Sequence, residues 1–390
     1  MRPAAVVDEI AAEHRAALVT LLTEEKGLSS PWLRAAFARV PRHSFMADHS
    51  FWLPERPDDR FRWPEMPDPA EAIAAAYLDR PLVVRCADDG GIRSSCTAPS
   101  LLGHLLQELD PPAGARTLEI GTGTGYAAAL LSEITGAAVE SVEIDHGLAA
   151  VAGRTLARLG FDMVTVRAGD ATRLDLGHAR FSRILVSAAT AAVPDGWITA
   201  LQPDGTLVTT YPLPWRGLTL VVRRTGEDLA TGWFLANNGR TCPSLVHDGS
   251  SGATVLPGAP VHQAVEVDLD EFGPAGSIEP GTPAGLALLA GFAVPGLAAL
   301  PSFPPAGGVP AVQLVDGAHE NCSLIVDGSG AVRATPAGRG LAERLTVVRR
   351  LWNDAGCPDE GAYVWSWQAG RTSLATCGGQ VLGERGFLGT

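Results

Sequence analysis

Three acidic residues stand where successive strands are predicted to end, and side chains at such positions can bind a ligand. Glu119 precedes a glycine-rich turn, Glu143 ends the next apolar run, and Asp170 follows a third run. Open α/β sheets bind ligands at the carboxyl ends of their strands. We expect Glu119 to face a cationic amino acid moiety, Glu143 to accept two ribose hydroxyls, and Asp170 to accept an adenine amine. Each alone could be an ordinary loop or cap residue, but the three in this order indicate one site.

The glycine-rich turn reads LEIGTGTGY from Leu118 to Tyr126. Glycine lets the backbone approach a ligand without an intervening Cβ. A dinucleotide fingerprint would carry its third glycine where this chain has Tyr126, so the spacing favours an amino acid moiety over a pyrophosphate. The predicted cofactor-binding residues are Glu119, Gly121, Thr122, Gly123, Gly125, Tyr126, Glu143, Ile144, Gly169, Asp170 and Ala171.

Alternating strands and helices from Arg116 onward must position this site, and such alternation is typical of a parallel α/β sheet. The segments 218–224 and 232–235, joined by a turn at 225–228, predict a closing antiparallel hairpin. Strands are predicted over 117–120, 139–144, 163–167, 183–187 and 206–210, and helices over 127–135 and 147–159.

The flanking segments are less regular. Residues 7–40 have helical periodicity ending at Pro41, 46–70 are rich in proline and charge and predict irregular chain, 79–99 predict a loop, and 100–109 a helix. After about residue 240 an α+β region follows, with a helix near 339–354 and strands near 312–315, 323–326 and 363–367. We therefore expect an N-terminal helical cap over 1–95, a cofactor-binding core over 96–240, and an accessory, peptide-binding domain over 241–390.

Composition narrows the class of partner. Acidic residues outnumber basic ones 43 to 30, giving a net charge of −13 that would repel a phosphate backbone, so no nucleic acid partner is expected. Six scattered cysteines without a CxxC pair indicate reduced thiols, and no apolar run is long enough for a membrane span or a signal peptide. We expect a cytoplasmic protein. His319 and Cys322 fall short of a metal site, so no metal is expected.

The segment from about 10 to 212 resembles the protein-L-isoaspartate O-methyltransferases. The resemblance rests on the glycine turn and on the segments VPRHSF (40–45), DRPL (79–82), TAP (97–99), SVE (141–143), GD (169–170) and ILVSAA (184–189). It implies a class I methyltransferase fold, a Rossmann-like sheet with a reversed final hairpin. It also implies S-adenosylmethionine (SAM) as methyl donor, S-adenosylhomocysteine as product, and a carboxylate as acceptor.

Two departures from that family point to a subgroup. Twelve residues, Val83–Ser94, lie between the DRPL segment and Ser95, and about 150 residues follow the closing hairpin. The SSCTAPSL segment (94–101) and the WSWQAGR segment (365–371) resemble methyltransferases encoded beside ATP-grasp ligases in graspetide pathways. That resemblance implies methylation of an aspartate in a precursor peptide already cyclised by the ligase, followed by aspartimide formation.

The acceptor side of the reaction follows from the same resemblance. Thr97, with Ser95 and Ser94, is the candidate catalytic set, because hydroxyl donors can hold a carboxylate that needs no general base at neutral pH. Arg93 could add a charge-assisted bond or be a solvated loop residue, and His43 could bind substrate or make a structural hydrogen bond. Alternatives are an isoaspartate repair enzyme, a lanthipeptide-pathway aspartate methyltransferase and, least favoured, a non-catalytic SAM-binding scaffold.

Overall fold

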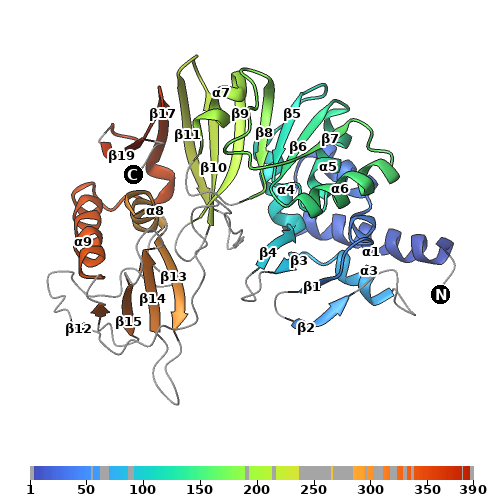
Figure 1. Cartoon of the computed structure of the whole chain (residues 1–390), viewed down its shortest axis with the longest axis horizontal. Coiled ribbons are helices and arrows are strands. Elements are labelled where there is room, and N and C mark those ends of the chain that lie inside the picture. The colour runs from blue at the N-terminus through green and yellow to red at the C-terminus, as the bar shows by residue number, and fades with distance from the viewer. Residues whose placement is uncertain are drawn as a thin grey trace.

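A computed structural model gives the arrangement of most of the chain (Figure 1). It describes residues 4–53, 56–61, 70–86, 92–188, 193–212, 217–236, 265–266, 284–294, 297–302, 311–316, 323–327, 332–334, 338–379 and 381–386. His319 and Cys322, considered above as metal ligands, lie outside these residues.

A ten-stranded sheet forms the centre of the molecule, in the order β19-β18-β17-β11-β10-β9-β8-β5-β6-β7. The strands β5 to β9 are parallel to one another, and β10 and β11 close the series as an antiparallel hairpin, as predicted. Their bounds are β5 Thr117–Ile120, β6 Val139–Glu143, β7 Val164–Ala168, β8 Phe181–Val186, β9 Leu201–Pro212, β10 Gly217–Arg224 and β11 Leu229–Ala236.

Helices cover both faces of this sheet and bury two apolar clusters. One cluster contains side chains of α1, α2, α4, α5 and α6, and the other contains side chains of α7, α8 and α9. No helix within the described part of the chain has the length and apolarity to cross a membrane. The helices are α1 Ala4–Glu24, α2 Pro31–Arg39, α3 Ala70–Ala76, α4 Pro99–Leu109, α5 Tyr126–Thr135, α6 His146–Arg158, α7 Asp195–Ala200, α8 Ala284–Ala293 and α9 Gly338–Asp354, with 3₁₀ turns η1 Arg42–Phe45 and η3 Glu360–Ala362.

The N-terminal part differs from the prediction in three places. The helical stretch 7–40 is two helices, because Gly27 has a φ of +73° and Pro31 starts a new helix. The segment predicted as irregular contains β1 (Phe51–Leu53) and β2 (Arg56–Phe61), and the predicted loop contains β3 (Leu82–Cys86) and β4 (Ile92–Cys96). These strands form a separate sheet, β2-β1-β3-β4, in which the described residues of the insertion, 83–86 and 92–94, lie in the antiparallel pair β3–β4, called the β3–β4 hairpin below.

The C-terminal part is joined to the central sheet by hydrogen bonds. Strands β17 (Tyr363–Gln368), β18 (Arg371–Thr376) and β19 (Val381–Gly386) extend that sheet, with β17 antiparallel to β11. A further sheet, β12-β16-β15-β14-β13, lies beside α8 and α9 at the opposite end of the molecule from the N-terminal cap (Figure 1). The central sheet therefore contains strands from both sides of the boundary expected near residue 240, whereas the five-stranded sheet lies entirely after it. This sheet comprises β12 Val265–Glu266, β13 Leu297–Ser302, β14 Ala311–Asp316, β15 Ser323–Asp327 and β16 Val332–Ala334.

Candidate active site

The glycine-rich turn joins β5 to α5 with a backbone that favours glycine. Gly121 and Gly123 have φ angles of +96° and +53°, in the left-handed region. A Cβ on Gly121 would lie 3.2 Å from the backbone nitrogen of Ala188, so the turn also passes close to the end of β8. The turn therefore forms the floor of a pocket that lies between the ends of the parallel strands and the β3–β4 hairpin.

Glu119 is fully buried in the wall of this pocket. Its Oε2 accepts a 2.6 Å hydrogen bond from the Ser141 hydroxyl, which lies 2.6 Å from the Thr122 hydroxyl. Its Oε1 is buried and has no hydrogen-bond partner among the described residues. Burial raises the pKa of the Glu119 carboxyl to about 8, although the hydrogen bond from Ser141 acts in the opposite direction. A cationic ligand group in the pocket would give Oε1 its missing donor.

Glu143 and Asp170 follow at the ends of β6 and β7. Glu143 Oε2 accepts a 2.8 Å hydrogen bond from the backbone N–H of Gly123, and its Oε1 accepts one of 3.0 Å from Asp145. Asp170 Oδ1 accepts hydrogen bonds from the backbone N–H and the hydroxyl of Thr172, at 2.9 and 2.7 Å. Both carboxylates are thus held in place by local backbone while each keeps lone pairs for a ligand.

The opposite wall of the pocket is formed by β4 and the residues after it. Ser94, Ser95 and Thr97 all line the pocket. A Cβ built on Gly123 would lie 3.7 Å from Ser94 Oγ and 3.9 Å from the Ser95 carbonyl oxygen, so the hairpin sits directly over the glycine turn. The three hydroxyl residues and the three carboxylates therefore share one pocket.

Arg42, which is not among the predicted site residues, makes hydrogen bonds to the backbone of this wall but does not itself line the pocket. Its fully buried guanidinium donates hydrogen bonds to five backbone carbonyls. The acceptors are Ala76 at 2.7 Å, Leu78 at 3.1 Å, Arg80 at 3.0 Å, Cys96 at 3.4 Å and Thr97 at 3.1 Å. Asp79 adds a hydrogen bond of 2.8 Å from the backbone N–H of Ser100, at the start of α4. The VPRH and DRPL segments thus fix the backbone on both sides of Thr97.

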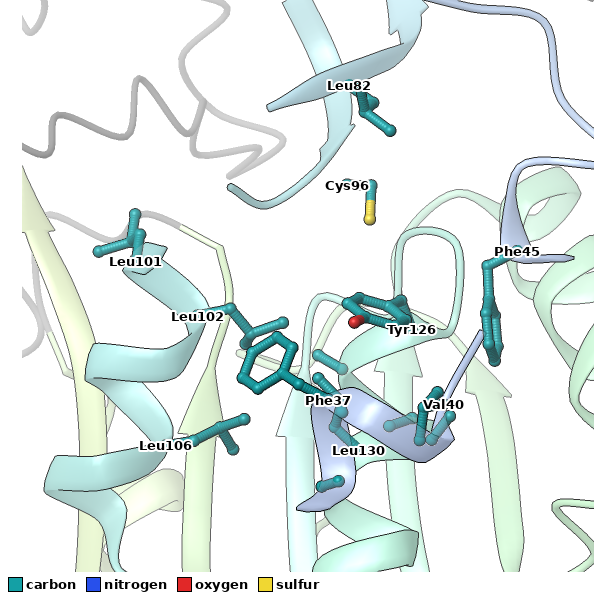
Figure 2. Packing of buried hydrophobic residues seen from close by; sticks show 14 of the residues in the cluster. Phe37, Val40, Phe45, Leu82, Cys96, Leu101, Leu102, Leu106, Tyr126 and Leu130 are labelled. Carbon is teal, nitrogen blue, oxygen red and sulfur yellow. The ribbon is translucent and has the colours of Figure 1, made fainter. Parts of the chain in front are cut away.

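Tyr126 connects the glycine turn to the cap. Its ring packs edge-on against Phe37 and Phe45, with centroids 6.4 and 5.6 Å away. Figure 2 shows it between Leu102 of α4 and Phe45, beneath Cys96 at the end of β4. The first residue of α5 therefore packs against the same elements that carry the hydroxyl residues.

All of the predicted site residues except Gly125 and His43 line this pocket. Arg93 lines it and is exposed. Gly125 does not line it, and instead packs against α6, where a Cβ would lie 3.2 Å from Leu156. His43 also does not line the pocket: it is buried in the cap, with Nδ1 2.8 Å from the Tyr77 hydroxyl, and burial lowers its pKa to about 4. This position favours the structural alternative given above for His43.

Trp197 of α7 also lines the pocket, although no sequence pattern indicated it. Its indole N–H donates a 3.0 Å hydrogen bond to the Ala171 carbonyl, beside Asp170. Two residues earlier, Asp195 accepts a 2.7 Å hydrogen bond from the indole N–H of Trp367 in β17. The C-terminal strands thus contact the pocket through one short helix, which brings together residues 172 positions apart.

Comparison with known proteins agrees with this geometry. The family model for protein-L-isoaspartate(D-aspartate) O-methyltransferase matches residues 68–219. A protein-L-isoaspartate O-methyltransferase of Roseiflexus castenholzii is 34% identical over 217 residues, 56% of this chain and 86% of that protein. One of Gloeobacter violaceus is 35% identical over 183 residues, 47% of this chain and 75% of that protein.

A solved structure of a protein-L-isoaspartate O-methyltransferase superposes on most of the chain. The TM-score is 0.56 with 18% identity, covering 93% of this chain and 99% of that one. At this identity the likeness concerns the fold, and the predicted class I methyltransferase fold is confirmed. The coverage also shows that the fold of the C-terminal part has a counterpart in a protein of that name.

Proposed function

The chain belongs to the protein-L-isoaspartate O-methyltransferase family of SAM-dependent carboxyl methyltransferases, and we propose that its acceptor is an aspartate side chain of a ribosomal precursor peptide. In this proposal an ATP-grasp ligase has already cyclised the precursor, as in graspetide pathways. The methyl ester then leads to an aspartimide and, on hydrolysis, to isoaspartate.

The residues of the pocket fit SAM. We assign the methionine ammonium to Glu119, whose buried Oε1 otherwise has no partner among the described residues. Glu143 receives the ribose hydroxyls, and Asp170 receives the adenine amine, with Ile144 and Ala171 beside it. When bound, SAM supplies an electrophilic methyl group on a sulfonium.

The observation that carries the proposed acceptor is the row of hydroxyls opposite the glycine turn. Ser94, Ser95 and Thr97 offer three O–H donors to an anionic oxygen in the same pocket as Glu119. A carboxylate is ionised at neutral pH, so methylation at oxygen requires no general base in the protein. The work of these residues is to orient the carboxylate and exclude water, which makes Thr97, with Ser95 and Ser94, positioning donors for the acceptor.

The ester explains why methylation would serve a tailoring pathway. Esterification gives the aspartyl carbonyl a methoxide leaving group in place of an oxide. The backbone amide nitrogen of the following residue can then attack that carbonyl, forming a C–N bond while methanol leaves with the amide proton. The product is a five-membered aspartimide, and its closure needs no further group from the enzyme.

Two departures from the repair enzymes bear on the choice between peptide tailoring and repair of damaged proteins, and one of them favours tailoring. The insertion hairpin and its SSCT segment resemble the graspetide subgroup, which supports tailoring. The C-terminal region does not decide between them, because the superposed isoaspartate methyltransferase structure covers 93% of the chain. Repair therefore remains the second candidate, supported by the names of the curated relatives. A lanthipeptide precursor is the third, since it would present the same carboxylate chemistry.

Mass spectrometry with two substrates tests the proposal. The protein and SAM are incubated either with the ring-closed precursor encoded beside its gene or with a generic isoaspartyl peptide. One added methyl group, or the loss of one water as the aspartimide, on the cyclised precursor alone supports the proposal. Methylation of the generic isoaspartyl peptide alone would instead identify an enlarged repair enzyme. Each substrate incubated with SAM in the absence of the protein is the control for non-enzymatic change.

A further inference from the structure

The pocket contains two buried polar atoms that have no hydrogen-bond partner among the described residues. One is Oε1 of Glu119, and the other is the hydroxyl oxygen of Ser187, the residue that follows β8. Both residues line the pocket. Because a buried polar group without a partner costs free energy in the folded protein, two such atoms in one pocket indicate a place where a ligand binds.

The central sheet places these two side chains next to each other. Glu119 in β5 stands opposite Leu185 in β8, and Ser187 comes two residues after Leu185, so alternation turns both polar side chains toward one face. The pairing continues to Ser187, whose backbone N–H donates a 2.8 Å hydrogen bond to the Ile120 carbonyl. On the other side of β5, Ser141 stands opposite Glu119 and donates to its Oε2. Glu119 therefore lies between two serines, and only one of them is bonded to it.

The electrostatics of Glu119 agrees with this placement. Burial is the main influence and raises the pKa of the Glu119 carboxyl to about 8, while the Ser187 hydroxyl acts against that rise. The two groups nevertheless lack the geometry of a hydrogen bond, since Glu119 Oε1 and Ser187 Oγ each remain without a partner in the described part of the chain. Ser187 thus lies close enough to affect Glu119 without satisfying it.

An ammonium group matches this pair of oxygens. It carries three N–H donors and no acceptor, and both a carboxylate oxygen and a hydroxyl oxygen can accept from it. A carboxylate of the ligand would suit the hydroxyl alone, because two carboxyl groups brought together disfavour ionisation of one of them. The methionine part of SAM carries one ammonium and one carboxylate, so Glu119 and Ser187 together select the ammonium.

We propose that Ser187 is a second cofactor-binding residue for the ammonium of SAM, whose N–H groups would donate to Ser187 Oγ and to Glu119 Oε1. Glu119 supplies the charge that favours a cation, and the Ser187 hydroxyl supplies a second acceptor that fixes the orientation of the ammonium. This inference deepens the proposed function and rests on its assignment of the ammonium to Glu119.

The proposal predicts that Ser187→Ala weakens the cofactor without weakening the fold. The hydroxyl has no partner among the described residues, so its removal should not lower the denaturation midpoint of the cofactor-free protein. The same change should raise the dissociation constant of S-adenosylhomocysteine about tenfold or more, because a hydrogen bond to a charged group is lost. Chemical denaturation and titration calorimetry on the full chain provide the two measurements.

Thr210→Val is the matched control for Ser187→Ala. Thr210 in β9 is also buried, and its hydroxyl likewise has no partner in the part of the chain that the structure describes, but it does not line the pocket. This variant should keep its denaturation midpoint and should bind S-adenosylhomocysteine within about twofold of the wild-type protein. Equal weakening of binding in the two variants would contradict a specific role for Ser187.

Two analogues of S-adenosylhomocysteine identify the group that Ser187 binds. The deaminated analogue keeps the carboxylate and lacks the ammonium, and the decarboxylated analogue keeps the ammonium and lacks the carboxylate. Ser187→Ala should weaken binding of the decarboxylated analogue about tenfold and binding of the deaminated analogue by less than about twofold.

The outcomes separate this inference from the proposed function, because none of these measurements involves methyl transfer. Unchanged affinity for S-adenosylhomocysteine in Ser187→Ala, or a loss that persists with the deaminated analogue, would overturn the role of Ser187. A lowered denaturation midpoint in Ser187→Ala but not in Thr210→Val would assign its hydroxyl to the fold and would overturn that role as well. The expected binding pattern without methylation of either the cyclised precursor or the isoaspartyl peptide would leave Ser187 standing and contradict the proposed carboxyl methylation.

Discussion

The Arg42 guanidinium donates a 3.1 Å hydrogen bond to the Thr97 carbonyl oxygen, which connects the cap to the acceptor side of the pocket. The same guanidinium donates hydrogen bonds to the carbonyl oxygens of Arg80 and Cys96, so one donor group binds the backbone both before Thr97 and at Thr97. Its charge lies 5.9 Å from the ring centroid of Tyr126, the residue that starts α5. Arg42 therefore positions the acceptor wall relative to the glycine turn without lining the pocket itself.

We expect Arg42→Lys to lower kcat for methyl transfer by about tenfold while the dissociation constant of SAM changes by less than about threefold. Lysine keeps the charge but cannot reach five carbonyls with one ammonium. Steady-state kinetics and SAM titration provide the two measurements.

Arg224→Lys is the matched control for Arg42→Lys, because Arg224 is also fully buried and donates to several carbonyls, among them Thr199 at 3.0 Å and Glu227 at 2.7 Å. Both variants should lose roughly 2 kcal/mol of unfolding free energy. Equal loss of kcat in the two would show that Arg42 acts through general stability alone.

Thr97→Val should lower kcat much more than it lowers SAM affinity, since valine preserves the shape of the side chain and removes its O–H donor. Loss of one hydrogen bond to an anionic acceptor predicts a fall of roughly 10- to 100-fold. Thr97→Ser keeps the donor and should retain most of the activity. Unchanged turnover in Thr97→Val would remove this hydroxyl from the mechanism.

SAM binding should release protons below pH 8. The pKa of Glu119 is raised to about 8 in the cofactor-free protein, so its buried carboxyl is mostly protonated near pH 6.5. An ammonium placed against Oε1 favours the ionised form, and ionisation releases a proton. Calorimetry at pH 6.5 in buffers of different ionisation enthalpy should detect close to one proton per SAM. Glu119→Gln should abolish the release and weaken SAM binding about tenfold or more.

The raised pKa of Glu119 also predicts how the stability of the folded protein changes with pH. The pKa of Glu119 in the folded protein lies above the usual value of 4.5. Its contribution to the free energy of unfolding is therefore fully present below pH 4.5 and is lost as the pH rises through about 8. The cofactor-free wild-type protein should lose stability across this range relative to Glu119→Gln in chemical denaturation. Parallel curves for the two proteins would mean that Glu119 is not the titrating group.

Trp367→Phe should weaken SAM binding several-fold although Trp367 is in β17. The substitution removes the indole N–H that Asp195 accepts, and Asp195 begins the helix that places Trp197 in the pocket. Trp352→Phe is the matched control, because its indole N–H donates a 2.9 Å bond to the Pro358 carbonyl. Each variant should lose roughly 1 kcal/mol of stability, but only Trp367→Phe should alter the dissociation constant of SAM.

The sequence predicted the cofactor side of the site more fully than the acceptor side. Glu119, Glu143 and Asp170 follow apolar strands whose periodicity is local and regular, so their place at one sheet edge could be inferred. Strands β1 to β4 are short, and β3 and β4 lie within a segment rich in charge and glycine, so their pairing depends on contacts that periodicity does not encode.

Arg42 and Trp197 were missed for a related reason. Their partners are backbone carbonyls, which every residue has, so no pattern of side chains points to them. Trp365 and Trp367, in contrast, stand two residues apart in β17, the spacing that places side chains on one face of a strand, and the structure buries both.

The pairing of β11 with β17 also governs how the protein is made. Trp233 lies opposite Val364 in this sheet, so the ribosome must add more than 100 residues after β11 before its partner strand exists. Until then the nascent chain carries an unpaired strand edge, which invites association with other chains. Closing so long a loop is slow, so protection of this edge arrives late in synthesis. Chaperone capture of chains stalled between residues 240 and 360 should therefore exceed capture of the finished protein.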